Sequence, residues 1–292
     1  MPAVHQIYIM RAIYHFLLFT SIFIATCALM MIWQTNRILG LRYDVATFYT
    51  FVFFATLCSY NFHWYLTTGP SEAPRMIWGR KYRRLQLILF FAGLIGAAYY
   101  FWLLRAHWLP LSGAIILTFL YSAPKVPQKV FMWLRKVAIG KTLFLTAVWT
   151  YVTTLLPVFI AGNPIPPQVV YLNLHRFFLI YAICILFDLR DIESDRKEGI
   201  RSLITYLSKA NLDKVYYASL LIAVIAAAAL WSYTTSVAVI TLWLAVLVTA
   251  LLTRRAQQRP TDYLFYFVLD GMMMFSALLH YLLMLLSGLS GL

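Results

Sequence analysis

Five of the ten acidic residues in this chain of 292 residues fall within positions 188–198, where an apolar segment ends. Three of them, Asp188, Asp191 and Asp195, stand at positions i, i+3 and i+7. On a continuing helix their carboxylates lie within a sector of about 60°. Such carboxylates repel one another unless a cation lies between them, and Mg²⁺ commonly binds carboxylates together with substrate phosphate oxygens. The spacing therefore predicts a magnesium site. The alternative is a solvent-exposed acidic helix end that pairs with nearby arginine and lysine side chains.

The composition is that of a membrane protein. Hydrophobic residues make up 62% of the chain and charged residues only 12%, with a mean hydropathy of +0.76, which excludes an ordinary soluble domain. A net charge of +14 could suggest nucleic-acid binding, but the cations lie in loops between apolar runs. We therefore expect membrane lipid as a partner and no nucleic acid. The three cysteines lie in apolar segments without paired spacing, so neither a disulfide framework nor a zinc site is indicated.

Apolar segments account for nearly the whole length, and we expect a single integral-membrane domain over residues 1–292. The fold class predicted is all-α, a polytopic bundle of about nine transmembrane helices. The expected spans are 12–33, 44–66, 85–104, 108–122, 138–161, 174–191, 215–233, 236–252 and 262–286.

Positive charge is distributed unequally between the two sides of this bundle. One side carries 19 lysine and arginine residues and the other carries three. The positive-inside rule then places the N-terminus and the acidic segment in the cytoplasm and the C-terminus outside. We expect a multi-pass protein of a bacterial inner (plasma) membrane.

Further polar residues fall on the same predicted cytoplasmic side. The candidates for substrate binding there are Asn61, His63, Arg75, Ser122 and Arg201. Acidic residues for a metal, cations for phosphates and an apolar bundle are together suited to an isoprenoid diphosphate, which has an anionic head and a lipid tail. His63 fits equally an interfacial aromatic belt, and Arg75 a topology-determining charge in contact with anionic lipid.

Two segments resemble a known family. Residues 188–203 are similar to the second aspartate-rich motif of the UbiA superfamily of membrane prenyltransferases, in a form similar to its lipid-ether and quinone branches. Tyr121 and Lys125 resemble the YxxxK element that follows the fourth helix of that family. The nine-helix layout with cytoplasmic site loops agrees along nearly the whole chain.

The resemblance implies a prenyltransferase that moves a prenyl group from a polyprenyl diphosphate to a lipophilic acceptor, with Mg²⁺ as cofactor. It implies that Asp188, Asp191 and Asp195 hold the metal, that Lys125 contacts the diphosphate and that Tyr121 shapes the site. Metal and lysine would neutralise the charge that develops on the leaving group.

The sequence departs from the family in the first motif, NDxxDxxxD, at the end of the second span. Only Asn61 matches, because Phe62, Tyr65 and Gly69 occupy the aspartate positions. The loss of these carboxylates favours an alternative function, that of a non-catalytic protein that binds a polyprenyl lipid or regulates its metabolism. A transporter is a weaker alternative that rests only on Asp270.

Asp270 lies well inside the last expected span, where a carboxylate facing lipid is costly. We therefore expect it to face the bundle interior, and predict that it partly replaces the carboxylates missing near Asn61. The alternative is a packing role, in which Asp270 hydrogen-bonds a neighbouring helix.

Overall fold

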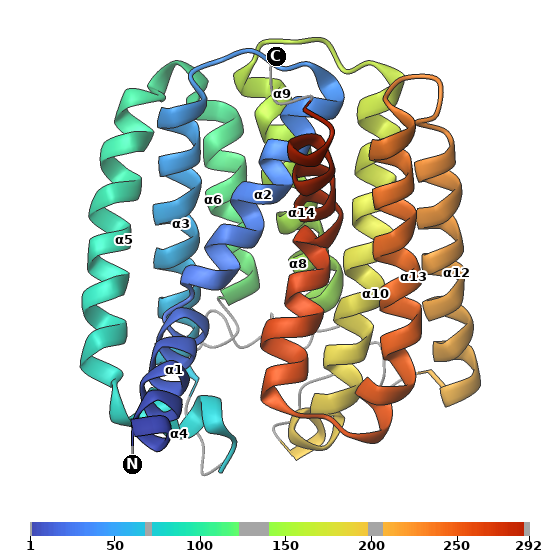
Figure 1. Cartoon of the computed structure of the whole chain (residues 1–292). Coiled ribbons are helices and arrows are strands. Elements are labelled where there is room, and N and C mark those ends of the chain that lie inside the picture. The colour runs from blue at the N-terminus through green and yellow to red at the C-terminus, as the bar shows by residue number, and fades with distance from the viewer. Residues whose placement is uncertain (1, 68–71, 123–139, 198–206, 289–292) are drawn as a thin grey trace.

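The computed structural model describes residues 2–67, 72–122, 140–197 and 207–288, and every regular element within these residues is a helix. The expected all-α bundle is therefore confirmed. Figure 1 shows most of the helices running side by side along the molecule. Helices α1 and α4 and the carboxyl end of α10 lie at one end, and α14 ends at the other (Figure 1).

The helices follow one another with short connections wherever the structure describes the chain. In order they are α1 Pro2–Phe19, α2 Ile22–Leu39, α3 Val45–Leu66, α4 Pro74–Lys81, α5 Arg83–Leu103, η1 Arg105–His107, α6 Trp108–Ser122, α8 Gly140–Thr150, η4 Tyr151–Leu155, α9 Leu156–Ile160, α10 Pro167–Lys197, α12 Lys209–Ala228, α13 Ser236–Gln258, η5 Leu264–Leu269 and α14 Asp270–Leu286. Elements η4 and η5 are π-helical turns that continue directly into α9 and α14.

Among the described residues, eight helical segments are long and apolar enough to cross a membrane. They are Ile22–Leu39, Val45–Leu66, Arg83–Leu103, Thr142–Ile160, Pro167–Ile192, Lys209–Ala228, Ser236–Gln258 and Leu264–Leu286. The fourth expected span, 108–122, forms α6, but its 15 residues are fewer than the roughly 20 that a membrane crossing needs. The chain is a multi-pass integral membrane protein.

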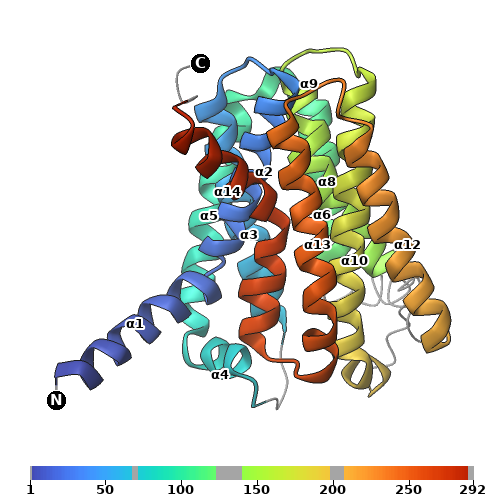
Figure 2. The same cartoon turned by 45° about the vertical axis from the view of Figure 1, so that its right-hand side comes forward.

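The first expected span, 12–33, is not one helix. Ser21 adopts a left-handed conformation with φ of 70°, which ends the regular path of the chain between α1 and α2. The amino-terminal part of α1 projects away from the bundle (Figure 2), whereas His15 and Phe19 near its carboxyl end contact Tyr263 and Trp78. The first span is therefore corrected to α2 alone, which begins at Ile22.

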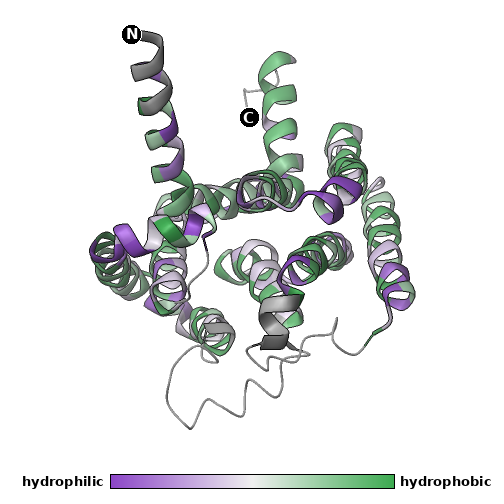
Figure 3. Cartoon of the chain, turned by 90° about the horizontal axis from the view of Figure 1, so that it is seen from below, coloured by the Kyte–Doolittle hydropathy of each residue, from purple (hydrophilic) through white to green (hydrophobic). Residues whose placement is uncertain are grey.

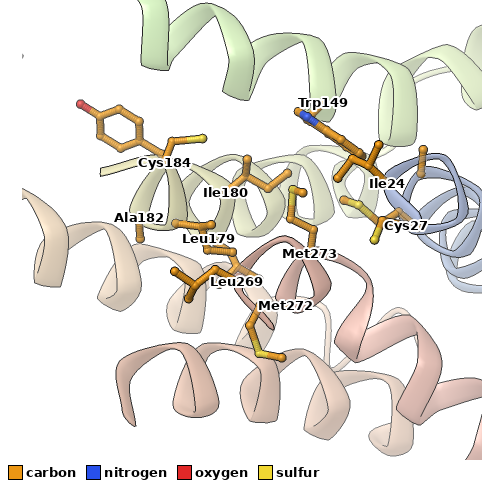
Figure 4. Close-up of a cluster of buried hydrophobic side chains, with 14 of the residues drawn as sticks. Ile24, Cys27, Trp149, Leu179, Ile180, Ala182, Cys184, Leu269, Met272 and Met273 are labelled. Atoms are coloured by element: carbon orange, nitrogen blue, oxygen red, sulfur yellow. The ribbon is translucent and has the colours of Figure 1, made fainter. Parts of the chain in front are cut away.

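The core lies where α2, α8, α10 and α14 meet. Figure 4 shows Ile24 and Cys27 of α2 beside Met273 of α14, with Trp149 of α8 and Ile180 of α10 completing the cluster. Close van der Waals packing of these apolar side chains holds the central helices together, since lipid tails are as apolar as the side chains themselves. Seen from the lower end of Figure 1, hydrophilic residues gather at the near ends of the helices (Figure 3).

The pair α3 and α5 is packed unusually closely at one point. A Cβ atom added to Gly93 would lie 2.6 Å from the backbone nitrogen of Cys58. Only glycine allows the two backbones to come this close. The contact therefore fixes the carboxyl-terminal half of α3 against α5.

Candidate functional site

The acidic motif lies on an unbroken helix. Helix α10 continues to Lys197, so Asp188, Asp191 and the backbone of Asp195 belong to one helix, as the spacing predicts. Asp188 is buried, and its Oδ2 accepts a hydrogen bond from the hydroxyl of Thr142 on α8. The side chain of Asp191 is 36% exposed. The motif therefore presents one buried and one accessible carboxylate, while the side chain of Asp195 lies outside the described residues.

Arg190, which the sequence indicates only as a salt-bridge partner of the acidic helix end, pairs with Asp191 and is enclosed beside it. Its Nε and Nη2 atoms donate to both oxygens of Asp191, at 2.7 and 3.3 Å, and Nη2 also donates to the hydroxyl of Tyr266 at 3.0 Å. The guanidinium lies over the rings of Phe187, Phe265 and Tyr266, 5.2, 4.5 and 4.9 Å from their centroids. Its remaining nitrogen, Nη1, is buried and has no hydrogen-bond partner in the described part of the chain.

Asp270 is the first residue of α14 and follows the π-helical turn η5 directly. It is partly buried and interacts electrostatically with Arg190 and Arg75. Asp270 therefore faces the neighbouring helices, as expected. Its role in ligand binding stays a prediction. Burial lowers the pKa of Arg75, while Tyr266, Asp262 and Asp270 oppose that shift.

Asn61 is fully buried and is directed toward the break in the first two helices. Its Nδ2 donates to the carbonyl of Thr20 at 3.0 Å and to that of Leu57 at 2.8 Å. Its Oδ1 is buried without a hydrogen-bond partner among the described residues. The hydrogen bond from Asn61 to Thr20 thus connects α3 to the break between α1 and α2.

Arg75 is also buried, with 3% of its surface exposed. Its backbone nitrogen donates to Oδ2 of Asp262 at 2.8 Å, and its Nη1 donates to the carbonyl of Phe19. The guanidinium lies 4.2 Å from the ring centroid of Trp64 and 5.9 Å from that of Trp78. Such an enclosed side chain does not match the alternative of a headgroup contact at the membrane surface.

Aromatic contacts replace carboxylates where the family's first motif falls. Phe62 stacks on Phe90 of α5 at 5.2 Å, and the guanidinium of Arg83 lies 4.5 Å from the ring of Tyr65. His63 lies edge-on to Trp64 at 5.8 Å, which places it within an aromatic cluster. The carboxyl end of α3 is therefore joined to its neighbours mainly through rings.

Several predicted residues lie outside the described part of the structure. They are Lys125 and Arg201 entirely, and the side chains of Tyr121 and Ser122 at the end of α6.

The carboxylate oxygens at the described end of α10 are of the kind that Mg²⁺ binds. No group of three or more histidine, cysteine, aspartate or glutamate residues that could hold a metal occurs among the described residues. However, Mg²⁺ needs only one or two carboxylates when water and phosphate oxygens complete its coordination. Asp188 and Asp191 would supply hard oxygen ligands, and their hydrogen bonds with Thr142 and Arg190 are of the kind that orients metal ligands.

A model of the UbiA prenyltransferase family matches residues 77–277. The matched part contains the acidic end of α10, Arg190 and Asp270, and it begins after Asn61 and Arg75. No curated protein and no solved structure shows significant similarity to the chain.

Proposed function

Because the chain belongs to the UbiA prenyltransferase family, we propose that it transfers a prenyl group from a polyprenyl diphosphate to a lipophilic acceptor. The observation that carries this proposal is the pairing of Asp188 with Thr142 and of Asp191 with Arg190 at the end of α10. Oriented carboxylates above a bundle of apolar helices suit a ligand with an anionic head and a lipid tail. We place this site at the cytoplasmic end of the bundle, in a bacterial inner membrane.

The residues at the end of α10 would bind and hold the donor. Asp188 and Asp191 would bind Mg²⁺ together with Asp195, while Thr142 keeps the carboxylate of Asp188 in place. Bound Mg²⁺ would neutralise the negative charge that develops on the departing diphosphate. Lys125 would contact the same diphosphate.

Asp270 would add a carboxylate to the site from the start of α14. Its electrostatic interaction with Arg190 of α10 and Arg75 of α4 supports this role. Tyr121, Ser122 and Arg201 would complete the contacts to the donor, and Asn61 and His63 would border the site on α3.

The direct test is to incubate the purified protein with Mg²⁺, labelled prenyl diphosphates and a membrane lipid extract. We expect a prenylated lipid whose mass identifies the acceptor. Asp191→Asn is the matched negative control, because it keeps the shape of the side chain and removes the charge. If the wild-type protein forms no product with any donor, the transferase proposal is wrong.

A second candidate is a protein that binds a polyprenyl diphosphate without transferring it. The aromatic side chains of Phe62 and Tyr65 at aspartate positions favour it, because the family's first group of metal ligands is absent there. Donor binding without any product in the same assay would identify this function.

A further inference from the structure

Arg190 is immobilised to an unusual degree for an arginine beside an acidic motif. Two of its nitrogens bind the two oxygens of Asp191, at 2.7 and 3.3 Å, in the paired geometry that matches a planar guanidinium to a carboxylate. The hydroxyl of Tyr266 accepts a third hydrogen bond. Rings from α10 and η5 enclose the group, so its direction is set before any ligand arrives.

One nitrogen of this group is left without an acceptor. Nη1 of Arg190 is buried, and the described residues offer it no hydrogen bond. A buried N–H of a charged group that has no acceptor lowers the stability of the folded protein. Such an atom therefore marks a place where a ligand or an ordered water can accept a hydrogen bond. We therefore interpret Nη1 as a donor to a bound ligand and not as an atom buried only by side-chain packing.

The surroundings indicate what kind of partner this is. Asp188 and Asp191 lie on the same helix as Arg190, and Asp270 interacts with it from α14. These carboxylates attract a divalent cation, which brings its own anion to the site. An arginine that is held on Asp191 and interacts with Asp270, with one donor still available, is suited to an oxygen of a diphosphate.

We propose that Arg190 is a resident cation of the site and binds the diphosphate directly. Nε and Nη2 stay on Asp191 while Nη1 donates to a diphosphate oxygen, so that a guanidinium and Mg²⁺ share the anionic group. This inference rests on the proposed donor, and it assigns to the chain itself a positive charge that a second metal ion would otherwise supply. Arg190 is a binding residue for the diphosphate head.

The test is calorimetric titration of the full-length protein in detergent with inorganic pyrophosphate, with and without Mg²⁺. We expect Arg190→Gln to weaken pyrophosphate binding about 10- to 100-fold, the range for losing a hydrogen bond to a charged group. Arg190→Lys should also weaken it, because lysine keeps the charge but lacks the planar fork. Arg84→Gln is the matched control: Arg84 is exposed at the start of α5, and its loss should change binding less than about twofold.

Each outcome bears on the inference. Pyrophosphate binding by Arg190→Gln and Arg190→Lys equal to that of the wild type overturns it, as does an equal loss in Arg84→Gln or no binding by the wild type. If Arg190→Gln fails to fold, the decision rests on Arg190→Lys, whose melting temperature is measured alongside.

The reaction and the inference fail in different ways. Binding through Arg190 without a prenylated product refutes the proposed reaction and leaves the inference intact. Product formation by Arg190→Lys with an unchanged KM for the donor refutes the inference and leaves the reaction intact.

Discussion

Asn61 and Arg75 donate hydrogen bonds to consecutive backbone carbonyls, those of Thr20 and Phe19, at the break between α1 and α2. The carbonyl oxygens at the end of a helix have no partner within it, so side chains from elsewhere must bind them when the end is buried. Asn61 of α3, which matches the family's first motif, and Arg75 of α4 thus stabilise the break between the first two helices.

We expect Asn61→Leu to lower the melting temperature, because it leaves the buried carbonyl of Thr20 without its donor. The loss should amount to about 1–3 kcal/mol of unfolding free energy. Thermal unfolding in detergent measures it, with Ser59→Ala as a control because the Ser59 hydroxyl bonds the carbonyl of Thr56 in its own helix. If Asn61→Leu keeps full stability but loses donor binding, Asn61 acts on the ligand and not on the break.

Thr142→Val should weaken Mg²⁺-dependent pyrophosphate binding while the fold is kept. Valine has the shape of threonine but cannot donate to Asp188, and loss of such an outer partner typically costs about 10- to 100-fold in metal affinity. Thr118→Val is the control, since the Thr118 hydroxyl bonds the carbonyl of Ala114 in its own helix. Equal affinities for the two variants would show that Asp188 needs no help from Thr142.

Asp270→Asn should impair donor binding or turnover while the melting temperature changes little. Asparagine keeps the size of the side chain but removes the charge that acts on Arg190 and Arg75. Pyrophosphate titration and the prenyl-transfer assay measure the first effect, and thermal unfolding measures the second. A destabilised variant with normal binding would assign Asp270 to packing alone.

Arg176 should be required for stability. This buried guanidinium donates only to neutral oxygens, on Thr35, Thr153, Thr154, Met31 and Gln34. Arg176→Met removes the hydrogen bonds that these buried oxygens accept from a charged group, and such bonds contribute about 1.5–3 kcal/mol each. Thermal unfolding checks this against Arg42→Met, which removes an exposed charge, and similar melting temperatures would contradict it.

The contact between α1 and the start of the last span should depend on pH. His15 Nε2 and the hydroxyl of Tyr263 are 2.5 Å apart, and burial, helped by Arg11, lowers the pKa of His15 below 6.5. A lowered histidine pKa means that the folded arrangement favours the neutral ring. The stabilisation is therefore present above pH 6.5 and is lost as the pH falls through the lowered pKa.

Hydrogen exchange of α1 at about pH 7.5 and about pH 5.5, corrected for intrinsic rates, measures this effect. We expect less protection at the lower pH in the wild type and no such change in His15→Gln. An equal change in both would mean that another group titrates.

The sequence predicts α10 and its acidic end well, because Asp188, Asp191 and Asp195 carry helical spacing directly after a long apolar run. The break at Ser21 could not be predicted. Residues 12–33 contain neither glycine nor proline, and the donors that hold the break come from α3 and α4. Tertiary contacts decide the path of the chain there.

The enclosure of Arg190 could not be predicted for a similar reason. In the sequence this residue is one more cation beside an acidic motif, where a surface ion pair is the ordinary interpretation. Its ring partners Phe265 and Tyr266 lie in η5, far along the chain, so its enclosure and its unpaired nitrogen emerge only when α10 packs beside the last span. The available signal in the sequence is the aromatic run 265–267, which precedes the intramembrane Asp270.

The π-helical turn Leu264–Leu269 sets the angular phase of the rest of the last span. Such a turn holds one residue more than an α-helical turn, so every later side chain is rotated by about 100° relative to an uninterrupted α-helix. The direction of Asp270 therefore depends on the number of residues before it as well as on its identity. Gain or loss of a single residue in this turn would move an intramembrane carboxylate from one side of its helix to another without any substitution.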